Sequence, residues 1–250
     1  MRTALISDIH GNAVALAAVL NALKTEGVDQ IVCLGDIAAD GPEPRSVIAQ
    51  LQALGGPVIM GNMDARFLKP RPRQINNTPP KNQMRQRIKE IQHWGMDQLT
   101  AEDLDFLRTF QPTATLALDQ ATDLLCYHGS PGSYDESIAS TTPEADLERM
   151  LTEQNAAILA GGHTHRQMLR RYGDQILVNP GSVGAPIRPT DKDRHPAWAE
   201  YALLDCAANG LGIQLRRLPL DIHVLIESAR ASGIPHPDWW IDLRYGFASG

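Results

Sequence analysis

The stretch Ala156-Ala157-Ile158-Leu159-Ala160-Gly161-Gly162-His163-Thr164-His165 joins a short apolar run to two glycines and two histidines one residue apart. The apolar run is typical of a buried strand, and the glycine pair indicates that the strand ends in an open loop. The two imidazoles then stand at the tip of that strand. Because imidazole is the commonest protein metal ligand at neutral pH, the stretch predicts a metal site if other donors stand at comparable strand ends.

Other polar side chains do follow strand-like runs. These runs and the donors after them are Thr3–Ser7 with Asp8 and His10, Gln30–Leu34 with Asp36, Pro57–Met60 with Asn62, and Asp123–Tyr127 with His128. Amphipathic helices are predicted between the first three runs, at Ala13–Leu23 with Asn12 as N-cap and at Pro42–Leu54. Strands alternating with helices predict parallel βαβ units, which gather these polar residues at one edge of a sheet.

The alternation stops between Arg66 and about Pro112, where four prolines predict a loop followed by helices at Gln83–Trp94 and Ala101–Phe110, the second capped by Thr100. We interpret residues 66–112 as a small helical cap inserted into a single domain that spans residues 1–250. The remaining predicted elements are strands at Thr113–Leu118 and Gln175–Val178, helices at Pro143–Glu153 and Asp221–Ala231, and a hairpin of Tyr201–Cys206 with Leu211–Leu218 around Asn209-Gly210. Trp239-Trp240 is expected to pack the tail onto the body.

Composition narrows the class of protein. The chain has 250 residues, of which 43% are hydrophobic and 21% charged, as in an ordinary globular protein. No signal peptide or membrane span is apparent, so we expect a cytoplasmic protein. Cys33, Cys126 and Cys206 each lie in a strand-like run, which favours buried free thiols over disulfides or a zinc cluster.

Charge is unevenly distributed along the chain. The formal net charge of −6 argues against general coating of nucleic acid, yet eight basic residues and one acid stand between Arg66 and Glu90. This segment is either a solvated surface or a region that steers an anionic substrate, and it leaves open an enzyme acting on RNA.

The strand-end donors predict a dinuclear centre. Seven donors are too many for one tetrahedral ion and suit two ions that share a bridging carboxylate; the seven are Asp8, His10, Asp36, Asn62, His128, His163 and His165. Mixed nitrogen and oxygen ligands suit Mn²⁺, Fe, Zn²⁺, Ni²⁺ or Co²⁺. Two divalent ions and two carboxylates leave a residual charge of about +2, which favours an anionic substrate and the electrostatics of phosphoester hydrolysis.

The ordered motifs Asp8-x-His10, Gly35-Asp36, Gly61-Asn62, His128 and Gly162-His163-x-His165 resemble the signature of the calcineurin-like metallophosphoesterases, and the loop 179–184 (NPGSVG) is similar to small bacterial and archaeal members. The resemblance implies an α/β fold, a four-layer αββα sandwich of two mixed β-sheets flanked by helices. It also implies a catalytic role for Asp36 and Asn62, with attack by a metal-bound hydroxide on phosphorus and Mn²⁺ as the favoured ion. One metal would take Asp8, His10, Asp36 and His165, and the other Asp36, Asn62, His128 and His163.

One position departs from the family pattern. Many members have histidine directly after the motif asparagine, where this chain has Met63. A thioether cannot donate a proton, so Asp64 or water is the candidate for this role, and Asp64 has an alternative interpretation as an exposed ion pair with Arg66. The resemblance is then closest to members lacking that histidine, which implies a phosphodiesterase.

The substrate that we expect is a small-molecule or nucleotide phosphoester, contacted by Asn62 and Arg188. The alternatives left open are a phosphomonoesterase or phosphoprotein phosphatase, a nuclease that acts on RNA, and a non-catalytic scaffold of the same fold.

Overall fold

The computed structural model describes residues 1–69, 82–187, 197–207 and 210–246. Its strands are β1 (Arg2–Ile6), β2 (Gln30–Cys33), β3 (Ala114–Ala117), β4 (Asp123–Cys126), β5 (Ile158–Ala160), β6 (Met168–Tyr172), β7 (Gln175–Asn179), β8 (Trp198–Ala207) and β9 (Gly210–Pro219). Its helices are α1 (Ala13–Glu26), α2 (Pro44–Leu54), α3 (Asn62–Phe67), α4 (Gln83–Gln98), α5 (Ala101–Arg108), α6 (Glu144–Met150), α7 (Ile222–Ala231) and α8 (Pro237–Tyr245). None of these helices is long and apolar enough to cross a membrane.

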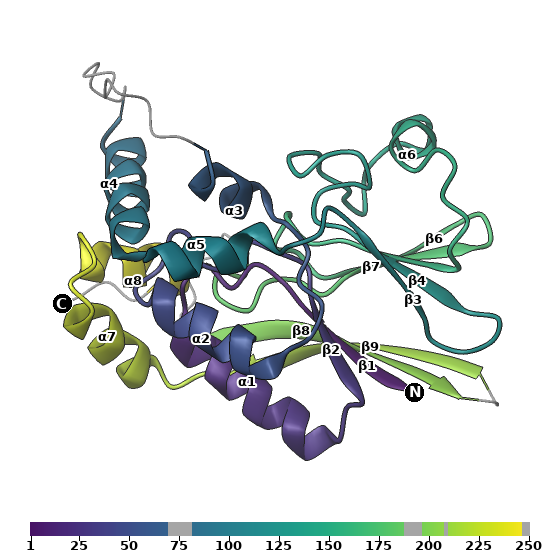
Figure 1. Cartoon of the computed structure of the whole chain (residues 1–250), viewed down its shortest axis with the longest axis horizontal. Coiled ribbons are helices and arrows are strands. Elements are labelled where there is room, and N and C mark those ends of the chain that lie inside the picture. The colour runs from purple at the N-terminus through teal and green to yellow at the C-terminus, as the bar shows by residue number, and fades with distance from the viewer. Residues whose placement is uncertain (70–81, 188–196, 208–209, 247–250) are drawn as a thin grey trace.

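The strands form two mixed sheets, in the orders β2-β1-β8-β9 and β3-β4-β5-β7-β6. In the first sheet β1 pairs parallel with β2 and antiparallel with β8. In the second, β4, β5 and β7 run parallel, while β3 and β6 are antiparallel edge strands. Helices α1, α2 and α7 lie outside the first sheet and α6 outside the second (Figure 1). The four-layer αββα sandwich predicted from the sequence is confirmed.

Alternation along β1 shows how the layers are built. Leu5 faces the second sheet, in a buried cluster with Leu124 and Ile158, whereas Ala4 and Ile6 face the helices. A third cluster buries the other face of the second sheet against α6. Since successive side chains of a strand point to opposite faces, a strand segment buried on both sides is apolar at consecutive positions, as residues 4–6 of β1 are.

Several local features agree with the sequence. Asn12 accepts a hydrogen bond from the Ala15 amide at the start of α1, and Thr100 caps α5 in the same way through Asp103. The three cysteines are buried free thiols. Trp240 is buried on α8, so the expectation that the tail packs onto the body is confirmed.

Other predictions need correction. The strand predicted at Pro57–Met60 is reduced to two isolated parallel bridges, Cys33 with Val58 and Ile59 with Gln111. Helix α3 begins at Asn62, in a segment for which no helix was predicted, and β6 and α8 were not predicted either. The β6 sequence carries two adjacent arginines, and it forms because an edge strand can leave one face in solvent.

The predicted cap begins inside α3 and contains α4 and α5, while residues 70–81 lie outside the described part of the chain. Ile91 of α4 and Leu107 of α5 belong to the same buried cluster as α1 and α2. In the described part, this segment is therefore continuous with the main core, and its role as a cap over the site stays a prediction.

Gly35 fixes the approach of two loops at the carboxyl edge of the first sheet. Its φ is +98°, and a Cβ there would stand 2.6 Å from the Gly61 nitrogen and 2.9 Å from the Ile59 carbonyl oxygen. Only glycine allows the loop after β2 to pack directly on the segment that leads into α3.

Replacing Gly35 with Ala should therefore destabilise the protein by more than about 2 kcal/mol, because backbone atoms that cannot move aside meet the new methyl group. Gly27→Ala is the matched control, since Gly27 also has a positive φ of 65° but has nothing within 4 Å of the added Cβ. The control should cost only about 1–2 kcal/mol, the cost of a left-handed backbone. Urea unfolding measures both, and equal losses would contradict the close approach.

Candidate metal centre

The strand-end loops bring the predicted donors together at one edge of the two sheets. Five of the seven candidate ligands have a left-handed backbone, with φ between 49° and 65°; they are Asp8, His10, Asp36, His163 and His165. This conformation is uncommon for residues other than glycine and costs free energy. Its concentration at these positions indicates that the surrounding fold holds the side chains in a strained arrangement.

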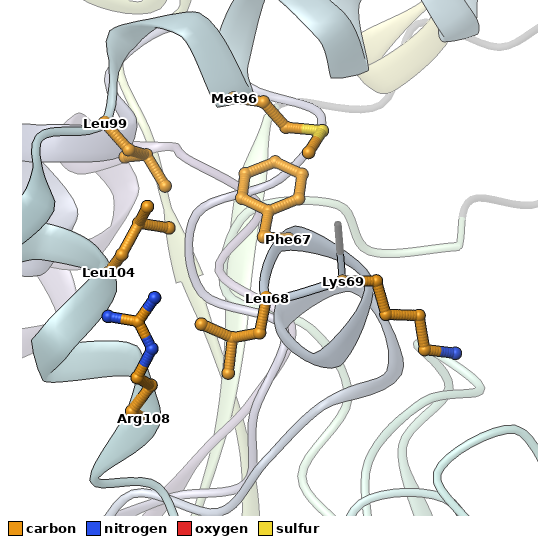
Figure 2. A pocket seen from close by; sticks show the side chains of 7 residues that line it. All are labelled: Phe67, Leu68, Lys69, Met96, Leu99, Leu104 and Arg108. Carbon is orange, nitrogen blue, oxygen red and sulfur yellow. The ribbon is translucent and has the colours of Figure 1, made fainter. Parts of the chain in front are cut away.

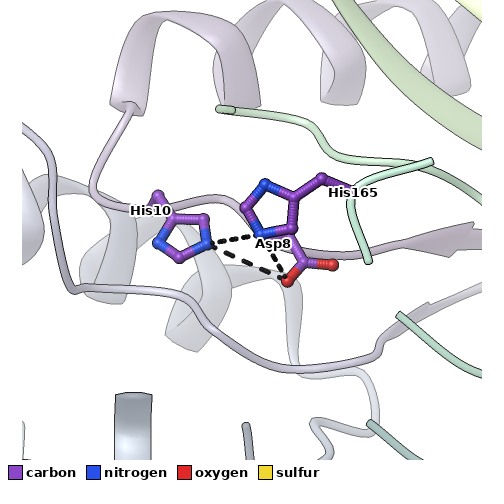
Figure 3. Close-up of side chains that lie close together, drawn as sticks. All are labelled: Asp8, His10 and His165. Carbon is purple, nitrogen blue, oxygen red and sulfur yellow. Dashed lines mark hydrogen bonds and ion pairs between the residues drawn. The ribbon is translucent and has the colours of Figure 1, made fainter. Parts of the chain in front are cut away.

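The first group consists of Asp8, His10 and His165, whose ligand atoms all lie within 4.8 Å of one another. Asp8 Oδ1 is 3.2 Å from His165 Nε2 and 3.9 Å from His10 Nε2, and the two Nε2 atoms are 3.0 Å apart (Figure 3). Asp8 and His10 come from the loop between β1 and α1, and His165 comes from the loop between β5 and β6. The group matches the first predicted metal set, in which Asp36 is the remaining member.

The second group surrounds His128. Its Nε2 lies 3.1 Å from Asn62 Oδ1 and 3.6 Å from Asp36 Oδ2, and its ring stands edge-on to that of His163 with centroids 5.2 Å apart. Asp36 Oδ2 is also 3.8 Å from His10 Nε2. Asp36 thus lies between the two groups, and Asp8 also has a ligand atom within 4.8 Å of those of Asp36 and His128. The bridging role of Asp36 stays a prediction.

The histidine pair that motivated the prediction divides between the groups. The His165 ring faces His10 at a centroid distance of 4.7 Å, whereas His163 faces His128. Alternation along an extended strand does not produce this division, because both histidines have a left-handed backbone. Gly162 allows this turn to approach β1, since a Cβ there would overlap Ser7 Oγ.

Backbone carbonyls orient three of the imidazoles. The Nδ1 atoms of His10, His128 and His165 donate to the carbonyl oxygens of Ala39, Leu34 and Ala185, at 3.2, 2.7 and 2.7 Å. A carbonyl can only accept, so Nδ1 carries the proton and the Nε2 lone pair of each neutral ring faces the cluster. Sequence patterns do not reveal these partners, because any residue supplies a carbonyl.

The buried charges of the cluster favour the binding of cations. Asp8 and Asp36 are fully buried, and Asp8 Oδ1 has no hydrogen-bond partner. Burial lowers the pKa of His128, yet the Asp36 and Asp8 carboxylates and the Leu34 carbonyl together outweigh burial and raise this pKa to about 10. Two imidazole lone pairs at 3.0 Å repel each other unless a cation lies between them, either a proton or a metal ion. The donor set therefore fits divalent metal binding.

Asp64 lies beneath the cluster and is completely buried. Its Oδ2 accepts from the amides of Asp36 and Gly61, at 2.8 and 3.1 Å, and its Oδ1 accepts from the Ile37 amide at 3.0 Å. Burial and the Asp36 carboxylate raise its pKa to about 7. The alternative of an exposed pair with Arg66 is wrong, and these bonds favour a positioning role over the predicted general-acid role.

The loop after β7, at the edge of the second sheet, forms hydrogen bonds to the loops that carry the ligands. Ser182 Oγ donates to the Asp8 carbonyl oxygen at 2.6 Å, and Asn179 Nδ2 donates to the Gly162 carbonyl oxygen at the same distance. Ser7 Oγ donates to Asp8 Oδ2 at 2.6 Å. The sequence signal for this support was the loop motif at residues 179–184, whose contacts the sequence alone did not reveal.

Two predicted positions behave differently. Arg188 lies outside the described residues, so its predicted contact with substrate stays a prediction. Met63 is buried in the main core and contributes through its backbone, whose amide donates to Asp36 Oδ1 at 2.8 Å.

A separate cavity of about 190 Å³ lies between α3, α4 and α5. Figure 2 shows its lining, which is largely apolar, with Phe67 and Leu68 facing Leu99 and Leu104. Asn62 begins α3, whereas Phe67 ends it, so the cavity lies at the other end of this helix. None of its lining residues is a candidate ligand, and the cavity is distinct from the metal centre.

Comparison with known proteins agrees with this geometry. The family model for the calcineurin-like phosphoesterase superfamily domain matches residues 1–209. A metallophosphoesterase from Sphaerobacter thermophilus is 24% identical with a TM-score of 0.72, covering 99% of this chain and 100% of that one. Hypothetical protein PH1004 from Pyrococcus horikoshii is 22% identical with a TM-score of 0.78, covering 99% of each chain.

A curated relative matches over a shorter region. The chain is 44% identical over 61 residues to the uncharacterized protein MJ0912 from Methanocaldococcus jannaschii, which is 24% of this chain and 25% of that protein. The chain belongs to the calcineurin-like phosphoesterase superfamily. The class so defined is that of metal-dependent phosphoric ester hydrolases with a dinuclear centre.

Substitutions of Asp64 distinguish a positioning role from a role as general acid. Asp64→Ala should leave three buried amides without acceptors, at about 1–3 kcal/mol each, and should lower both thermal stability and metal content. Asp64→Asn keeps one carbonyl acceptor and should lose less. Asp174→Ala, at an exposed turn, is the control. A variant with normal stability and metal content but reduced turnover would instead restore the general-acid role.

Proposed function

We propose that this protein is a dinuclear-metal phosphodiesterase that hydrolyses small-molecule or nucleotide phosphoesters. One metal would be held by Asp8, His10, Asp36 and His165, and the other by Asp36, Asn62, His128 and His163. The proposal is carried by two adjoining donor groups, one of Asp8, His10 and His165 and one of Asp8, Asp36 and His128. Asp36 Oδ2 lies 3.8 Å from His10 Nε2 and 3.6 Å from His128 Nε2, which supports it as the bridging ligand. Mn²⁺ is the ion that we favour.

In this proposal the side chains of the site bind and orient the metal ions and the substrate, and none of them is the nucleophile. When bound, two divalent ions would lower the pKa of water, polarise the ester and stabilise negative charge at phosphorus. The histidines contribute neutral nitrogen ligands whose tautomer is set by the carbonyl bonds. Asp8 and Asp36 contribute the only ligand charges, so the loaded site keeps a net positive charge of about +2 that attracts a phosphoester anion.

Asn62 is placed to act on both ligand and substrate. Its Oδ1 approaches His128 Nε2, which leaves the amide nitrogen of the same side chain as a hydrogen-bond donor. We assign that donor to a phosphoryl oxygen. Neither residue that follows Asn62 is suited to supply the proton for the leaving group, because Met63 cannot donate one and both oxygens of Asp64 accept from backbone amides.

This gap favours esters with good leaving groups. The Mn²⁺-reconstituted protein should hydrolyse bis(p-nitrophenyl) phosphate faster than p-nitrophenyl phosphate, and its rate should fall steeply as the leaving-group pKa rises. Steady-state kinetics over a series of aryl phosphodiesters measures this slope. Absence of hydrolysis of both p-nitrophenyl esters would overturn the proposed function, and faster monoester turnover would favour a phosphomonoesterase.

The two histidines of the opening motif should control different metals. His165→Ala should weaken the metal shared with Asp8 and His10 by roughly 100-fold or more, and His163→Ala the metal shared with Asn62 and His128. His93→Ala, on the exposed side of α4, is the control. Elemental analysis after dialysis at limiting metal should show about one ion per chain in each ligand variant. Loss of both ions in each variant would contradict the assignment.

A further inference from the structure

Two buried aromatic side chains of α8 form hydrogen bonds to loops beside the candidate metal centre. Trp240 Nε1 donates to the Asp40 carbonyl oxygen at 2.7 Å. The Tyr245 hydroxyl accepts from Asn12 Nδ2 at 2.6 Å and donates to the Gly184 carbonyl oxygen at 3.4 Å. Both rings are almost completely removed from solvent. Helix α8 is therefore joined to the loop between β2 and α2 through its indole, and to the loops after β1 and after β7 through its phenol.

The two carbonyls bound by α8 are each adjacent to a carbonyl that orients a histidine of the first ligand group. The indole binds the residue after Ala39, whose own carbonyl oxygen accepts from His10 Nδ1 at 3.2 Å. The phenol binds the residue before Ala185, whose own carbonyl oxygen accepts from His165 Nδ1 at 2.7 Å. Because neighbouring peptide groups share one α-carbon, fixing the first carbonyl restricts the direction of the second.

The phenol also links the loop that carries Asp8 to the loop after β7. Asn12 Nδ2, which donates to the phenol, donates to the Gly184 carbonyl oxygen as well, at 3.3 Å. The Gly184 amide in turn donates to the Asp8 carbonyl oxygen at 3.1 Å. Tyr245 thus completes a buried network that holds these two loops together beside the first ligand group.

The histidine of the second ligand group is oriented from a different part of the structure. His128 Nδ1 donates to the Leu34 carbonyl oxygen at 2.7 Å, and the Leu34 amide donates to the Ile6 carbonyl oxygen at 2.8 Å. Leu34 belongs to the buried cluster between the two sheets, whereas Trp240 and Tyr245 belong to the cluster on the helix side of the first sheet. Contacts from α8 therefore favour one ligand group over the other.

We propose that Trp240 and Tyr245 are positioning residues for the metal ion that Asp8, His10 and His165 would bind. They act through the loops, by fixing the carbonyls that set the tautomer and direction of two of its imidazoles. The inference rests on the assignment of two metal ions in the proposed function. It extends the family match, because α8 lies beyond the residues that the family model covers.

The test measures Mn²⁺ binding to one half of the centre at a time. Tyr245→Phe removes the hydroxyl and keeps the buried ring, so packing changes little. In a His163→Ala background, which lacks a ligand of the second metal, isothermal titration should show about 10-fold weaker Mn²⁺ binding when Tyr245→Phe is added. In a His165→Ala background, which lacks a ligand of the first metal, the same substitution should leave Mn²⁺ affinity unchanged.

Two tryptophan variants extend the comparison on the same helix. Trp240→Phe removes the donor to the Asp40 carbonyl and should show the same selectivity as Tyr245→Phe. Trp239→Phe is the matched control, because Trp239 is half-buried and packs against Arg87 of α4, whose Cζ lies 5.4 Å from the ring centroid. This control should leave Mn²⁺ affinity unchanged in both histidine backgrounds.

Selectivity distinguishes positioning from a general structural role. A general loss of stability would weaken Mn²⁺ binding in both histidine backgrounds alike. Equal weakening in the two backgrounds, or no weakening by Tyr245→Phe in either, would overturn the inference, whatever the result for Trp240→Phe. If the unmodified protein binds two ions but hydrolyses no ester, the proposed function fails, and the inference is still decided by the Mn²⁺ affinities.

Discussion

Two buried carboxylates that require a cation are the constraint on which this structure depends. Asp8 and Asp36 end neighbouring parallel strands and are both removed from solvent, and no lysine or arginine in the described residues forms an ion pair with either. Their negative charge instead favours the protonated form of the neighbouring imidazoles, as the raised pKa of His128 shows. Such an arrangement is costly unless metal ions satisfy it.

The fold supplies the rigidity that this arrangement needs. Three apolar clusters separate the four layers, and each strand that delivers a ligand is packed on both faces. The loops beyond the strands can therefore hold left-handed backbones at Asp8, Asp36 and His165. Asp64 then ties the loops after β2 and before α3 into one unit through three amides. A strained site is stable here because the surrounding structure determines its geometry.

The sequence predicts those features that depend on residue type and on the order of residues along the chain. Apolar runs that end in Asp8, Asp36 and His128 locate both the strands and the donors, because parallel strands bring their carboxyl ends to one edge. Contacts made through backbone atoms are not encoded in this way, so the carbonyls that orient the imidazoles were not foreseen. Asp64 shows the same limit, since two of its three partners are amides of a distant loop. Helix α8 was missed because its short amphipathic pattern is weak.

The most direct test of the account is the number of metal ions needed for catalysis. Metal-free protein is titrated with Mn²⁺ while phosphodiester turnover and bound metal are measured in the same samples. The shared position of Asp36 between His10 and His128 predicts that activity rises until two ions are bound per chain and then stays constant. Full activity at one ion per chain, or activity independent of bound metal, would contradict a dinuclear centre.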